Sequence, residues 1–192
     1  AEEILYLLGV LLNPDNEKLP FPLVMTGPQS AEPYFRRIDD FVGATLGPDA
    51  QRRYQIIIDD PMAVARAMAA GLEDVLAFRK EHGDAFYFNW RLKISEQFQR
   101  PFVATHESMR GLRIDEDQPR HELAANLRRA FSGIVSGNVR EDTAELIERD
   151  GPFEIDGSRR IMGLLDDMLG AFVAQQRMKI SSGDYDPCYV IK

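Results

Sequence analysis

The sequence predicts an α/β fold. We expect the end of a parallel-sheet domain over residues 1–80 and a mostly helical domain over residues 81–192. Two observations support this expectation. Up to Lys80, helical and strand-like apolar patterns alternate, which is typical of parallel strands joined by crossover helices. Beyond Lys80 the alternation stops and long amphipathic helical patterns follow.

The first predicted element is a buried helix over residues 2–12. Apart from Glu2 and Glu3 almost every position is apolar, and a helix that is apolar on nearly all sides is usually buried. None of the residues that normally cap a helix precedes it, and the sequence does not begin with methionine. We therefore expect the chain to be the carboxyl-terminal part of a longer protein.

Two short apolar segments, residues 22–25 and 54–58, predict buried strands of a parallel sheet covered on both faces. A helix is predicted after each strand. The first of these helices covers about residues 30–46. The second runs to Lys80, and Asp60 is its expected N-cap because a proline follows.

Three helices are predicted in the second half, over residues 123–135, 141–149 and 161–173. The tail, residues 189–191, is expected to form an edge strand. Aromatic side chains gather at residues 86–90, where we expect them to form core between the two parts; a nucleotide-stacking role is the alternative.

Composition limits the classes of function. The 192 residues carry a formal net charge of -8, which argues against sequence-independent binding to nucleic acid or to an anionic membrane surface. The longest apolar run, residues 4–12, is too short to cross a bilayer. The single cysteine, Cys188, cannot form an internal disulfide, so a reducing cytoplasm is the expected location.

Glu2 and Glu3 are the first candidate site residues. The amino end of a helix carries partial positive charge, which favours ionised carboxylates and also binds phosphate groups. Acidic residues are common in a first helical turn, so on helix physics alone a structural role is favoured over a functional one.

The carboxyl ends of the two predicted strands are the second candidate region, because ligands of open parallel sheets bind outside those ends. Thr26 and Gly27 follow the first strand and could line such a site, or could form an ordinary turn. At the end of the second strand Asp59 is a candidate for the same region, whereas Asp60 is better explained as a helix cap.

Arg79 and Lys80 precede the aromatic segment, and cations beside stackable rings suit a nucleotide. The three histidines show no metal-binding spacing, and the sequence has no Walker loop, nucleophile elbow or complete dinucleotide motif. We therefore expect neither a metal nor a cofactor.

Residues 1–9 resemble the continuation of the motif Pro-Gly-Gly-x-Gly-Thr-x-x-Glu. This motif is found in phosphoribohydrolases once labelled lysine decarboxylases, which include the Lonely guy enzymes. Glu3 takes the place of the motif glutamate, and the glycine-rich part is not among the 192 residues. Several longer strings resemble the carboxyl-terminal domain of the bacterial pyrimidine/purine nucleotide 5'-monophosphate nucleosidases: residues 83–86, 88–90, 127–135, 137–139 and 172–175.

This resemblance implies a Rossmann-like catalytic domain and hydrolysis of the N-glycosidic bond of nucleoside 5'-monophosphates. It implies that Glu3 is catalytic, and we expect Glu2 at the same helix end and Thr26 and Gly27 at the strand end to contribute to substrate binding. It further implies a homo-oligomer and regulation by guanosine tetraphosphate, for which Arg79 and Lys80 are the candidate residues. Two alternatives remain: a non-catalytic nucleotide-binding or oligomerisation module, and a cytokinin-type phosphoribohydrolase.

Overall fold

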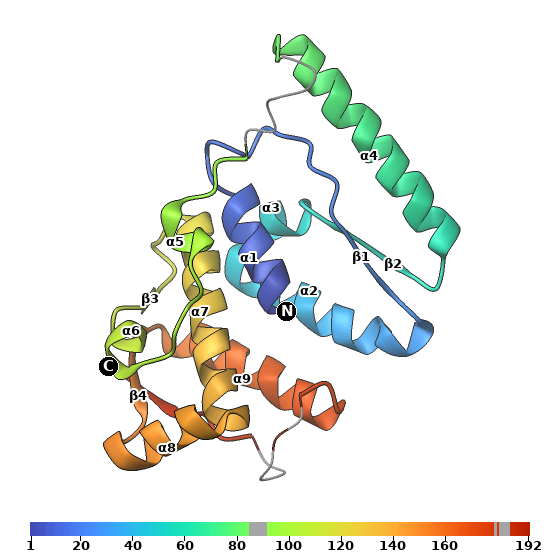
Figure 1. The fold of residues 1–192 in the computed structure, drawn as a ribbon. Helices are drawn as coiled ribbons and strands as arrows, with labels where there is room; N and C mark the ends of the chain where they lie inside the picture. The colour runs from blue at the N-terminus through green and yellow to red at the C-terminus, as the bar shows by residue number, and fades with distance from the viewer. Residues whose placement is uncertain (85–91, 179, 181–184) are drawn as a thin grey trace.

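We describe a computed structural model of the chain, in which residues 1–84, 92–178, 180 and 185–192 are placed (Figure 1). The aromatic segment expected at residues 86–90 lies outside the described residues. The described part is a mixed α/β fold with small parallel sheets.

The first half alternates between helix and strand, as predicted. Its elements are α1 (Glu2–Leu11), β1 (Val24–Gly27), η1 (Gln29–Ala31), α2 (Glu32–Leu46), α3 (Pro48–Gln51), β2 (Gln55–Ile58) and α4 (Pro61–Glu81). Strands β1 and β2 are parallel, with Gly27 opposite Ile58. Asp60 caps α4, because its side chain accepts a hydrogen bond from the Ala63 N–H at 2.8 Å. These elements confirm the predicted order, although β1 begins later than expected.

The expected burial of both faces of this sheet is not observed. Met25 is buried but Thr26, which points to the opposite face, is exposed. The long helix α4 extends away from the rest of the described chain (Figure 1). Four of its large apolar side chains are exposed: Met62, Met68, Leu72 and Leu76. The described residues thus contain two strands of this sheet, and helices cover only part of its surface. A complete Rossmann-like sheet is not observed among them.

The second half contains the three predicted helices together with a sheet that the sequence pattern did not predict. Its elements are α5 (Glu96–Gln99), α6 (His106–Arg110), β3 (Arg113–Ile114), α7 (Arg120–Val139), α8 (Glu141–Asp150), β4 (Phe153–Gly157), α9 (Arg159–Ala174) and β5 (Tyr189–Ile191). The strands form a parallel sheet in the order β3-β4-β5. The predicted edge strand at residues 189–191 is confirmed as β5. The prediction of a mostly helical second half is therefore correct only in part.

One hydrophobic core runs through both halves. Helix α1 packs against α7, and α2 packs against α9 (Figure 1). Leu5 and Leu8 on α1 belong to the same buried cluster as Leu127 on α7 and Phe172 on α9. The domain boundary near residue 80 remains a prediction, because a shared core can join two domains. Among the described helices, none has the length and apolar character needed to cross a membrane.

Candidate functional site

Glu2 is engaged in an ion pair within the fold. Its Oε1 lies 3.2 Å from Nη2 of Arg128 on α7, and the Arg128 guanidinium carbon lies 5.4 Å from the centre of the Tyr6 ring. The Arg128 side chain is only 15% exposed and that of Glu2 is 33% exposed. The pair ties the amino end of α1 to α7 and neutralises the Glu2 carboxylate.

Glu3 is exposed to solvent at the same helix end. Its side chain is 87% exposed, and its carboxylate lies 3.8 Å from the nitrogen of Ala1. Of the two adjacent acids, Glu3 is thus the one available to a ligand.

The carboxyl end of β1 is closely packed. A Cβ atom at Gly27 would lie 2.9 Å from the Ala31 Cβ and 3.2 Å from the Phe35 ring, so glycine is required by contact rather than by its φ angle. The side chain of Thr26 is exposed beside it. Asp59, which follows β2, has a φ of 54° and donates its N–H to the Gly27 carbonyl at 2.9 Å. A non-glycine residue with positive φ is uncommon, and such residues cluster at functional sites.

Tyr34 on α2 connects this strand end to the start of α1. Its hydroxyl oxygen accepts a hydrogen bond from the nitrogen of Ala1 at 2.9 Å. Burial raises the pKa of Tyr34, the negative charge of Glu3 raises it further, and the positive charge of Arg177 opposes both. The Arg177 guanidinium carbon lies 5.5 Å from the centre of the Tyr34 ring. Glu3 and Arg177 therefore both act electrostatically on one tyrosine.

Arg79 and Lys80 lie together at the end of α4. Arg79 is 6% exposed and Lys80 is exposed, and both line a cavity of about 390 Å³ whose other walls come from Leu76, Ala77, Gly83 and Asp84. Figure 1 shows this end of α4 well separated from the amino end of α1. The structure thus brings these two candidates together but places them apart from Glu3.

Two of the histidines and the cysteine make contacts within the fold that are typical of structural residues. His106 Nε2 lies 2.8 Å from the Gly151 carbonyl oxygen, and the His82 ring stacks on Phe78. Burial raises the pKa of the Cys188 thiol to about 11, so the thiolate is disfavoured. Within the described part of the chain, no three potential ligand side chains are grouped around a metal position.

Sequence reasoning missed Arg177 and understated Tyr34. Tyr34 fits the apolar stripe of the helix predicted over residues 30–46, a pattern typical of core residues, and a single arginine after a helix carries no pattern. The positive φ of Asp59 is likewise a property of the folded backbone alone. Arg177 and Tyr34 become candidates only through their positions around the end of β1, whereas Asp59 was already a candidate from its place after the second predicted strand.

The fold and this region define a mixed α/β protein with polar groups at the carboxyl ends of parallel strands, where such proteins bind ligands. Residues 72–192 match the family model described as pyrimidine/purine nucleotide monophosphate nucleosidase, C-terminal. The chain therefore belongs to this family.

The chain is also similar to curated proteins. It is 50% identical over 191 residues to proteins named pyrimidine/purine nucleotide 5'-monophosphate nucleosidase from Escherichia coli K12, O6:H1 and O157:H7. The alignment covers 100% of this chain but only 42% of each relative. The chain thus corresponds to less than half the length of these relatives.

Proposed function

We propose that this chain is part of an enzyme that hydrolyses the N-glycosidic bond of nucleoside 5'-monophosphates. Water attacks C1′ of the ribose, the bond from C1′ to the base nitrogen breaks, and the products are free base and ribose 5-phosphate. The observation that carries this proposal is the 50% identity over the whole chain to proteins named as such nucleosidases. The position of Glu3 agrees with it, because this acid is exposed at a helix end while its neighbour Glu2 is ion-paired.

Glu3 is our candidate for the catalytic carboxylate. Breaking the glycosidic bond builds positive charge on the ribose, and a fixed carboxylate lowers the barrier when it meets charge that exists only in the transition state. Glu3 would act in this way or would orient the attacking water. Thr26 and Gly27 would line the same site, and Glu2 would support it through its ion pair with Arg128.

The test is release of base from nucleoside 5'-monophosphates by the full-length protein. We expect Glu3→Gln to lower kcat about 100-fold or more, because removing one group that stabilises the charge of a transition state has an effect of this size in other enzymes. Glu145→Gln is the matched control, because Glu145 is an exposed acid on α8, away from the proposed site. The 192-residue chain alone should be inactive, since the glycine-rich part of the motif is not within it. Normal turnover by the Glu3 variant would remove this residue from the mechanism.

The alternative is a nucleotide-binding or oligomerisation module without catalysis. Calorimetry with nucleoside 5'-monophosphates separates the two, because binding by the full-length protein without product release favours the module. Helix α4 bears the exposed apolar side chains of a surface that could join subunits, and we propose a homo-oligomer. Light scattering on a Leu72→Glu variant of the full-length protein tests that surface.

We also propose that guanosine tetraphosphate binds near Arg79 and Lys80. Both residues line one cavity, and guanidinium and ammonium groups suit phosphates. Lys80 is the residue to test, because it is exposed whereas Arg79 is buried. Calorimetry should show at least about a tenfold weaker affinity for Lys80→Gln, and unchanged affinity would contradict this assignment.

A further inference from the structure

The turn after α9 fixes the direction in which Arg177 leaves the helix. The Arg177 N–H donates to the Phe172 carbonyl at 2.7 Å and the Gln176 N–H donates to the Val173 carbonyl at 2.9 Å, which together form a Schellman motif. Gln176 occupies the left-handed position with a φ of 56°. Glycine usually occupies that position, because other residues adopt the left-handed conformation at a cost in conformational free energy. The residue immediately before Arg177 therefore has an unfavourable backbone conformation.

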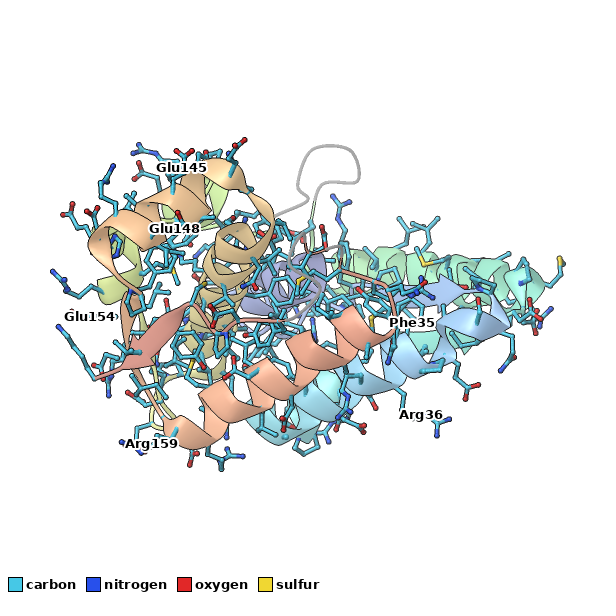
Figure 2. All side chains as sticks on the ribbon, turned by 90° about the horizontal axis from the view of Figure 1, so that it is seen from below. Phe35, Arg36, Glu145, Glu148, Glu154 and Arg159 are labelled. Carbon is cyan, nitrogen blue, oxygen red and sulfur yellow. The ribbon has the colours of Figure 1, made fainter. Side chains whose placement is uncertain are left out.

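This turn carries Arg177 back to the end of β1. Its Nη2 donates to the Ser30 carbonyl at 3.3 Å, and its guanidinium lies over the Tyr34 ring at 5.5 Å. Ser30 belongs to the short helical turn that follows Gly27. In Figure 2, Phe35, which packs against Gly27, lies toward the end of α9 that is farthest from its first residue, Arg159. An arginine from the second half thus lies beside the candidate site of the first half.

The charges around this point leave Arg177 available for an anion. Arg128, which also lies near the start of α1, is ion-paired with Glu2. No carboxylate of the described residues lies within salt-bridge distance of Arg177, and its side chain is exposed. Glu3 contributes negative charge nearby, since its carboxylate lies 3.8 Å from the Ala1 nitrogen, which donates to the Tyr34 hydroxyl. A phosphate brought next to such a carboxylate needs a cation to offset their repulsion.

We propose that Arg177 binds the 5′-phosphate of the substrate, as a second contact on that phosphate besides the glycine-rich loop of the motif. This inference rests on the proposed function. A guanidinium fork matches the geometry of a phosphate, and cation stacking on Tyr34 holds the fork in place. The residue binds and positions substrate and takes no part in proton transfer.

The test compares Arg177→Gln, Arg177→Lys and the unchanged full-length protein. Arg177→Gln should raise KM for nucleoside 5'-monophosphates about 10- to 100-fold with kcat changed by less than about threefold, because a charge-assisted hydrogen bond is lost. The inhibition constant of ribose 5-phosphate should rise by a similar factor, whereas inhibition by the free base should not change. Arg177→Lys should recover part of the loss. Arg159→Gln, at the opposite end of α9, is the matched control and should leave all constants unchanged.

Three outcomes would overturn the assignment. KM unchanged in Arg177→Gln would show that the phosphate does not contact this residue. Weaker inhibition by the free base instead of by ribose 5-phosphate would place Arg177 at the base. An equal loss in the Gln and Lys variants, with a lower Tm in both, would make its role structural. If the unchanged protein releases no base, the proposed function fails, and calorimetry with ribose 5-phosphate then tests Arg177 independently.

Discussion

Arg128 on α7 and Glu2 on α1 form the ion pair that joins the start of the chain to its second half, with 3.2 Å between Nη2 and Oε1. The Arg128 side chain is mostly buried, and its guanidinium also lies against the Tyr6 ring. The contact therefore combines charge, stacking and packing between two helices that share the core.

Arg128→Met should lower the free energy of unfolding by about 1–3 kcal/mol. The substitution leaves the partly buried Glu2 carboxylate without its partner and removes the stacking on Tyr6. Urea unfolding monitored by circular dichroism measures the change. The control is Arg36→Met, which breaks an exposed pair with Glu32 and should cost less than about 0.5 kcal/mol. Equal losses in the two variants would show that burial of the Arg128 pair adds nothing.

The described helices of ten or more residues could be predicted from the sequence, because their apolar patterns are long enough to recognise, whereas the short helices α3, α5 and α6 were not predicted. Helix α8 was predicted over residues 141–149 and is observed at Glu141–Asp150, and Asp60 was correctly predicted to cap α4. A helix makes its hydrogen bonds locally, so the pattern within one segment is sufficient to predict it.

The second sheet could not be predicted in the same way. Strand β3 has two residues, and β4 pairs with β3 and β5, which are distant in the sequence. Strand pairing depends on tertiary contacts, and strands this short carry no residue pattern that predicts it. The same reason explains why Arg177 was missed. Arg177 is a candidate only because the turn after α9 places it over the Tyr34 ring, and the spacing of residues in the sequence does not predict that contact.

Gly27→Ala should destabilise the fold by about 1–3 kcal/mol. The new methyl group would lie 2.9 Å from the Ala31 Cβ, so β1 or the following turn must move. In the full-length enzyme we expect KM to rise as well, because the end of β1 lines the proposed site. Gly163→Ala on α9 is the opposite control: nothing lies within 4 Å of the added atom, and the helix should gain about 0.5–1 kcal/mol. Thermal unfolding of both variants gives the comparison, and a stabilised Gly27 variant would contradict the packing argument.

The tail of the chain should make stability sensitive to high pH. Tyr185 and Tyr189 both donate hydrogen bonds to Asp166 on α9, at 2.6 and 2.7 Å. Burial raises the pKa of both phenols, and the Asp166 carboxylate raises them further. The unfolded phenols ionise near pH ~10, so this contribution is complete below that pH and is lost as the pH rises above it.

The measurement is the free energy of unfolding between pH 8 and 11. We expect it to fall above pH ~10 in the unchanged protein, and to fall less steeply when both tyrosines are replaced by phenylalanine. Tyr185→Phe alone should cost about 1–2 kcal/mol near neutral pH, because it removes a hydrogen bond to a charged acceptor. An identical pH slope in the double variant would show that other groups cause the alkaline loss.

The left-handed residue before Arg177 gives the last prediction. Gln176 has a φ of 56° in a position where glycine is usual, so Gln176→Gly should keep the turn and stabilise the fold by up to about 1 kcal/mol. Gln176→Val should destabilise it by about 1–2 kcal/mol, because a β-branched side chain tolerates this region poorly. Differential scanning calorimetry measures both changes. If Arg177 binds the phosphate, the Val variant should also raise KM, because a distorted turn moves the guanidinium away from Tyr34, whereas the Gly variant should not. A Val variant as stable as the unchanged chain would show that the turn has another conformation in solution.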